Sequence, residues 1–146
     1  MQHTYLLEPG RWIISGHWLE RNHAPIPVEG KTIVAWNQEN WFTMVTKLVF
    51  PDSDRPDISF QYRGRLDGDH QYTFILQHSE LGRVEGEGWI GLGSVVQRYW
   101  VLEDKQRRSG FETAYQINPD KYCLSSGIMS GHYLNSTMEA MVERQD

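Results

Sequence analysis

The chain has little cysteine, no long apolar run and no surplus of basic charge. Cys123 is the single cysteine among 146 residues, which excludes an internal disulfide and a metal site built from several cysteines. No apolar stretch approaches the roughly 20 residues that a membrane helix needs. The first residues show neither the basic nor the apolar part of a secretory signal. We therefore expect a cytoplasmic protein without a membrane span.

The charge balance also argues against a nucleic-acid partner. Fourteen Lys and Arg residues stand against nineteen Asp and Glu residues, a net charge of −5, whereas proteins that bind nucleic acids present a basic surface to the phosphates. Aromatic residues are plentiful, with six Trp, seven Tyr and five Phe. The length is that of one typical domain, so we expect a single domain over residues 1–146.

Short segments rich in aromatic and β-branched residues alternate with turn signals along the whole chain, as in β-sandwiches and β-barrels. In the clearest segment, Ile58, Phe60 and Tyr62 alternate with polar residues, and the hairpin signal Asp67-Gly68-Asp69 follows. Such segments predict about ten strands, at residues 10–21, 29–37, 40–50, 57–66, 70–78, 83–91, 94–103, 108–117, 121–130 and 132–144.

The last of these segments contains good helix formers over residues 136–144. We predict a strand there, because Met138, Ala140 and Val142 alternate with polar residues.

We predict that these strands form an all-β, antiparallel, up-and-down barrel. Consecutive strands with short links leave two exposed edges unless the sheet closes on itself. A two-sheet sandwich usually needs some longer links. The longest predicted link of this chain covers only residues 22–28, so we prefer the barrel. Alternate links of such a barrel lie at opposite ends. The links near residues 23, 53, 80, 105 and 131 include the longer, more charged ones, so we place the mouth of any cavity there.

The segment Gly10-Arg11-Trp12 resembles the G-x-W signature of the calycin superfamily, which comprises the lipocalins and their fatty-acid-binding relatives. The resemblance implies that Trp12 closes one end of the barrel and that an arginine near the end of the last strand packs over it. Arg144 is the matching residue, and the two would form a cation–π pair. Ten strands without a helical lid also resemble the nitrobindin-type haem barrels.

A barrel of about ten strands is wider than the eight-stranded barrels that side chains just fill. We therefore predict an interior cavity that binds a small, mostly apolar or amphipathic ligand non-covalently. Its polar contacts are expected from Tyr62, Tyr72, His78, Arg98 and Tyr99.

Which face of the strand at 94–103 points inward stays open. One choice places Arg98 inside, and the other places Gln97 and Tyr99 there. Gly86 and Gly88 are expected on the inner face, where they would either leave space for a ligand or let the barrel bend tightly.

Two other classes of function stay open. His23, His78 and His132 lie near the predicted mouth, where imidazoles could hold a metal or haem in a lyase, isomerase or peroxidase. No G-x-S-x-G or P-loop motif is present, so no catalytic residue is assigned and no cofactor is expected. The third class is a protein-interaction module that uses the outer aromatics Trp41, Trp89 or Tyr133, with a homodimer as one outcome.

Overall fold

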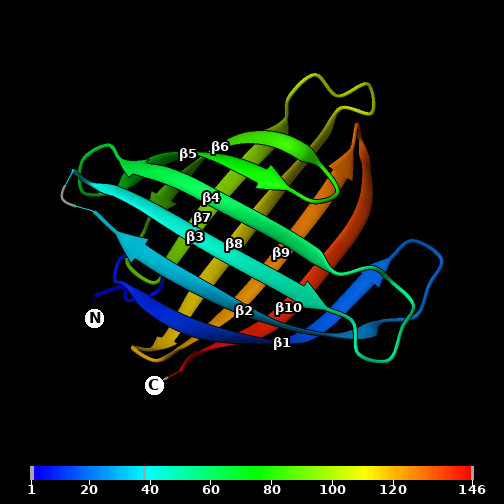
Figure 1. Ribbon diagram of the computed structural model, residues 1–146, viewed down its shortest axis with the longest axis horizontal. Helices are drawn as coiled ribbons and strands as arrows, with labels where there is room; N and C mark the ends of the chain where they lie inside the picture. The colour runs from blue at the N-terminus through cyan, green and yellow to red at the C-terminus, as the bar shows by residue number, and fades with distance from the viewer. Residues whose placement is uncertain (1, 38, 146) are drawn as a thin grey trace.

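The computed structural model, which describes residues 2–37 and 39–145, is a barrel of ten antiparallel strands (Figure 1). Each strand pairs with the next along the chain, and the first pairs with the last, which confirms the predicted all-β, up-and-down barrel. Among the residues described, no helix is long and apolar enough to cross a membrane. The strands are β1 (Gly10–Glu20), β2 (Ile26–Trp36), β3 (Trp41–Val49), β4 (Ile58–Leu66), β5 (Gln71–His78), β6 (Gly82–Ile90), β7 (Ser94–Val101), β8 (Arg108–Asn118), β9 (Lys121–Ser130) and β10 (Tyr133–Gln145).

Period-two alternation sets the inner face of most strands. In β5 the buried positions are Tyr72, Phe74, Leu76 and His78, and every residue between them is exposed. Successive side chains of a strand point to opposite faces, so the alternate apolar set enters the core. Gly68 has φ of 98° in the turn between β4 and β5, a conformation that glycine adopts without steric cost.

The last segment is a strand, as its alternation predicts. In β10, Met138, Ala140 and Val142 are buried, and the strand pairs with both β1 and β9. This double pairing closes the barrel and removes both sheet edges. The good helix formers of the segment do not decide its structure, because the strand satisfies its backbone groups on both sides and buries three apolar side chains.

The end of the barrel that holds both termini is closed by aromatic side chains. Trp12 has no exposed surface, and the Arg144 guanidinium lies 5.1 Å from the centre of its ring, which confirms the predicted cation–π pair. The register explains the contact, because Trp12 and Arg144 are direct partners across β1 and β10. Arg144 is also held by Glu8 and Asp120, at 3.4 and 3.6 Å.

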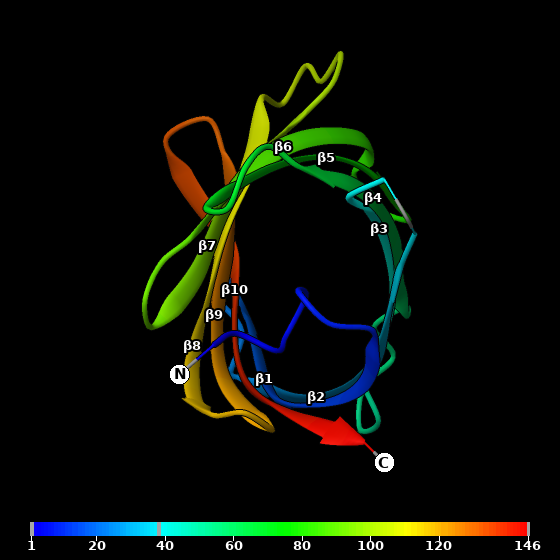
Figure 2. The ribbon, with the colours of Figure 1, turned by 90° about the vertical axis from the view of Figure 1, so that its left-hand side faces the viewer.

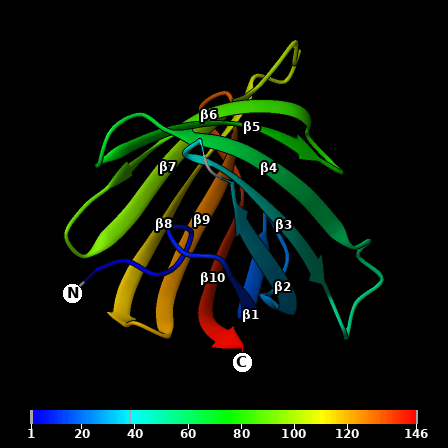
Figure 3. The same ribbon diagram turned by 60° about the vertical axis from the view of Figure 1, so that its left-hand side comes forward.

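The N-terminal segment completes this closure, and it crosses the opening inside the ring of strands (Figure 2). Tyr5 and Leu6 are buried there, and Tyr5 packs edge-on against Trp12. The Tyr122 hydroxyl accepts the Thr4 backbone N–H at 3.0 Å and donates to His3 Nδ1 at 2.9 Å. The long β3–β4 and β7–β8 links lie at the other end (Figures 1 and 3).

The inner glycines do not leave space for a ligand. Gly86 and Gly88 lie on the inner face of β6, as predicted. However, a Cβ on Gly88 would stand 2.0 Å from the Tyr72 ring, and one on Gly86 would stand 2.2 Å from the Phe74 ring. The glycines therefore admit aromatic rings from the neighbouring strand, which pack the closed half of the barrel.

Candidate ligand-binding cavity

A cavity lies inside the open half of the barrel. Its free volume is about 40 Å³, within about 480 Å³ of space between the lining atoms that includes the part open to solvent. Since one water needs roughly 10–15 Å³ of such volume, the cavity has room for a few waters. The lining side chains are mostly apolar and come from strands all around the barrel: Trp18, Leu48, Ile58, Phe60, Tyr62, Leu76, His78, Tyr99, Glu112, Ser126, Ile128, Ser136, Thr137 and Met138, with the backbone of Gly127.

Gln97 organises the buried polar groups below the cavity. The Tyr72 hydroxyl donates to Gln97 Oε1 at 2.7 Å, and Gln97 Nε2 donates to the Tyr62 hydroxyl oxygen at 2.7 Å. Gln97 Nε2 also lies 3.3 Å from Glu112 Oε2. One buried amide on β7 thereby fixes two phenols and a carboxyl from three other strands. Such a network holds polar groups in fixed positions at the base of an apolar pocket.

Glu112 is the acidic group of the cavity. Its partly buried side chain lines the cavity, and its one hydrogen bond among the described residues is the long contact from Gln97. Burial disfavours the charged form and raises the pKa of the Glu112 carboxyl to about 7. No Lys or Arg side chain appears among the described residues that line the cavity. Glu112 is therefore a carboxyl without a cationic partner, poised between its neutral and charged forms near neutral pH.

His78 faces the same cavity as a neutral ring. Its Nδ1 accepts the backbone N–H groups of Glu80 and Leu81, each at 3.1 Å, so the ring proton is on Nε2. Phe60 stacks parallel to the ring at 5.4 Å between centroids. Burial lowers the pKa of His78 to about 4. The imidazole thus stays uncharged at neutral pH and offers one N–H donor.

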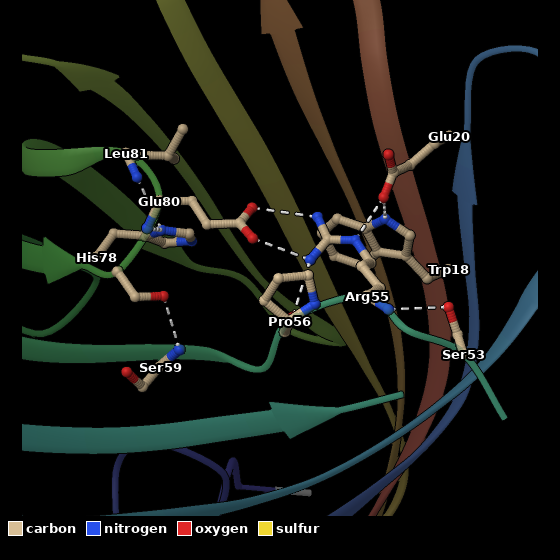
Figure 4. A network of polar contacts seen from close by, with 10 residues as sticks. Trp18, Glu20, Ser53, Arg55, Pro56, Ser59, His78, Glu80 and Leu81 are labelled. Atoms are coloured by element: carbon tan, nitrogen blue, oxygen red, sulfur yellow. Dashed lines mark hydrogen bonds and ion pairs between the residues drawn. The ribbon is translucent and has the colours of Figure 1, made fainter. Parts of the chain in front are cut away.

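Arg55, from the β3–β4 link, spans the open end of the barrel (Figure 4). Its guanidinium makes a two-point contact with Glu80 at 3.0 and 3.1 Å, and its Nε donates to Glu20. It also lies 4.7 Å from the ring centres of both Trp18 and Phe50. We call these residues, Glu20, Arg55 and Glu80 with the Trp18 and Phe50 rings, the Arg55 clasp.

The clasp joins the end of β1 to the β5–β6 link, and Trp18 connects it to the cavity wall. Hydrogen bonding to Arg55 lowers the pKa of the Glu20 carboxyl, so this pair stays ionised well below neutral pH.

The predicted ligand-binding residues fall into three groups. Tyr62, His78 and Tyr99 line the cavity. Tyr72 is buried on the inner face and reaches the cavity through its hydrogen bond to Gln97. Arg98 is exposed on the outer face of β7, 5.9 Å from the Trp100 ring, so of the two alternatives the one with Gln97 and Tyr99 inside holds. An outward Arg keeps its charge in water, which avoids the cost of burying it.

The three histidines considered for a metal do not converge. His23 is exposed and contacts the Arg21 carbonyl at 2.9 Å, and His132 is exposed in the β9–β10 link. His78 alone of the three lines the cavity. Across residues 2–37 and 39–145, no group of three or more His, Cys, Asp or Glu side chains is arranged to hold a metal ion.

Of the two central polar residues of the site, the sequence offered Gln97 as one of two alternatives for the inner face and did not single out Glu112. The pattern of β8 misleads, because its apolar Phe111, Tyr115 and Ile117 are exposed while Glu112 points inward. The usable signal is the pairing of Glu112 with Gln97 across β7 and β8, which places two polar side chains together on one face. Only knowledge of the register reveals it.

Comparisons with known proteins identify the fold alone. No protein-family model and no curated protein matches the chain. Among solved structures, Rv2717c from M. tuberculosis aligns with a TM-score of 0.74 at 13% identity, over 94% of this chain and 92% of that one. The S-type phycobiliprotein lyase CPES from Guillardia theta aligns with a TM-score of 0.64 at 14% identity, over 94% and 88%. A redesigned β-barrel, mFAP1, bound to DFHBI, aligns with a TM-score of 0.52 at 13% identity, over 97% of each chain.

Proposed function

We propose that this protein binds a small, mostly apolar ligand non-covalently in the open half of its barrel. The observation that carries the proposal is the cavity itself, which combines apolar walls with a few fixed polar groups from Tyr62, His78, Tyr99 and Glu112. Ligand sites in proteins have this composition. The likeness to a barrel with a bound small molecule, DFHBI, supports the same reading of the fold.

Binding requires the cavity to expand. An apolar cavity that holds benzene measures about 150 Å³, whereas the free volume of this cavity is about 40 Å³. Met138, with its three rotatable bonds, is the lining side chain best able to change shape. Opening of the Arg55 clasp provides the path, because the clasp holds the links at this end together.

Membership of the calycin superfamily is part of this proposal. It is supported by the closed end, where Arg144 lies over the Trp12 of the Gly10-Arg11-Trp12 segment. A barrel sealed at this end leaves one end for a ligand.

Methionine-methyl NMR tests the proposal with benzyl alcohol as the probe. Met138 lines the cavity, whereas Met141 lies on the outer face of the same strand beside Cys123. Titration should therefore shift the ¹³C-methyl signal of Met138 in a saturable way and leave that of Met141 in place.

Two variants of one strand provide the control. Ser126 points into the cavity and pairs with Met138, so Ser126→Leu should fill the space and abolish the shift. Ser125 is exposed on the outer face, so Ser125→Leu should retain it. A Met138 signal that does not move, or a response that is equal in both variants, would refute the proposal.

A further inference from the structure

The acidic group of the cavity has no basic partner, and this points to the chemistry of the ligand. We infer that the interior site selects an apolar molecule that carries an amine or another N–H donor, which is placed against Glu112. The inference rests on the proposed function and adds the class of ligand to it.

The first argument is the unfilled hydrogen-bonding capacity of Glu112. A carboxylate has about four lone-pair sites, and the described residues supply one donor, Gln97 Nε2, at the long distance of 3.3 Å. The contact from Gln97 goes to Oε2, which leaves Glu112 Oε1 without a hydrogen bond from the described residues. The cavity lies beside this carboxyl. A ligand N–H donor would supply the missing hydrogen bond, and a charge-assisted bond of this kind is about twice as strong as a neutral one.

The second argument is that the charges around the cavity favour a cation. The polar neighbours Tyr62, His78 and Tyr99 are neutral donors, and Arg55 at the mouth is matched by the two carboxylates of Glu20 and Glu80. An anionic ligand would meet the Glu112 carboxyl in a low-dielectric space without a compensating Lys or Arg. A cationic ligand would neutralise it, which offsets the cost of burying both charges.

Glu112 also changes charge near neutral pH, because burial raises its pKa to about 7. Tyr5, Tyr62, Tyr72 and Tyr99 face it from the N-terminal segment, β4, β5 and β7, and burial raises the pKa of each phenol above its usual value. The pKa of His78 on β5 lies at about 4. Between pH 5 and pH 8 these five groups therefore stay uncharged. An ammonium ligand would stabilise the ionised form of Glu112 and release its proton on binding.

Two matched probes test the inference. Benzylamine remains protonated between pH 5 and pH 8, and benzyl alcohol has nearly the same shape without the charge. Both are titrated while the Met138 methyl signal is followed. We expect benzylamine to bind about tenfold or more tightly at pH 8 than at pH 5, because only about one carboxyl in a hundred is ionised two pH units below its pKa. The affinity for benzyl alcohol should change little.

Glu112→Gln keeps the size and hydrogen-bonding shape of the side chain and removes the charge. It should weaken benzylamine about tenfold at pH 8 and leave benzyl alcohol unaffected. Glu85→Gln, on the exposed outer face of β6, is the matched control and should behave as the unmodified protein.

The outcomes separate the two proposals. If benzyl alcohol binds but benzylamine shows neither the pH dependence nor the loss in Glu112→Gln, the inference is wrong and the proposed function stands. If neither probe moves Met138, both are wrong. Should Glu112→Gln fail to fold, the pH dependence in the unmodified protein still decides.

Discussion

Replacing Glu112 with Gln should reveal a pH dependence of stability that the unmodified protein conceals. In the folded state the pKa of Glu112 is raised from 4.5 to about 7. The folded protein therefore holds this proton more tightly than the unfolded chain does. The associated stabilisation is fully present below pH 4.5 and is lost as the pH rises to about 7.

The magnitude follows from the two pKa values. At about 1.4 kcal/mol for each pH unit that separates them, the interval from 4.5 to about 7 corresponds to about 3 kcal/mol of unfolding free energy. Gln resembles the protonated carboxyl and does not titrate. Glu112→Gln should thus match the unmodified protein near pH 4.5 and exceed its stability by about 3 kcal/mol at pH 8.

In the unmodified protein, the titration of His78 changes stability with pH in the opposite direction to that of Glu112. The pKa of His78 falls from 6.5 in the unfolded chain to about 4 in the folded state. Its contribution is fully present above pH 6.5 and is lost as the pH falls towards 4, again by about 3 kcal/mol. The two slopes nearly cancel between pH 4.5 and pH 6.5. In Glu112→Gln the His78 slope is no longer offset, so stability should rise with pH over this range.

Urea unfolding monitored by tryptophan fluorescence at half-unit steps from pH 4.5 to pH 8 measures both effects. The difference between Glu112→Gln and the unmodified protein isolates Glu112, because all other titrating groups are common to both. The difference should grow from near zero to about 3 kcal/mol, and Glu85→Gln should show no such trend. Parallel curves for Glu112→Gln and the unmodified protein would refute the raised pKa and the burial that causes it.

Two substitutions test how the closed half of the barrel is packed. Gly88→Ala should destabilise the protein by about 1–3 kcal/mol, because its Cβ would lie 2.0 Å from the Tyr72 ring. Gly10→Ala, whose Cβ meets only Trp12 Nε1 at 3.5 Å, should cost much less. If the two variants lost the same free energy of unfolding in urea, the packing of the Tyr72 ring against Gly88 would not be what restricts this position. Arg144→Met keeps the aliphatic stem over Trp12 and removes the charge, so it should cost about 1 kcal/mol at low salt and less at high salt. A salt-independent loss would indicate packing rather than the cation.

The segments that alternate cleanly were predictable, because in them local pattern and tertiary environment agree. Ile58–Leu66 and Gln71–His78 bury their alternate apolar residues, and the pattern alone places their inner faces. The closure follows as well, since short links between antiparallel strands leave no other way to pair both edges. Trp12 and Arg144 meet because the first strand begins where the last one ends.

The inner faces of β7 and β8 depended on the tertiary structure. β7 carries bulky apolar residues on both faces, with Gln97 inside and Trp100 outside. In β8 the bulky apolar residues Phe111 and Tyr115 lie outside, while Glu112 lies inside. Pairing with neighbouring strands whose inner faces are set by their own sequences decides which face of β7 and β8 points inward. A shift of the register by one residue would move every side chain of the strand to the opposite face. The sequence by itself therefore determined the ten-stranded barrel and its closed end. The register decided which polar groups enter the barrel, because it places Gln97 and Glu112 side by side on the inner face, where Gln97 bonds to Glu112 and to the phenols of Tyr62 and Tyr72.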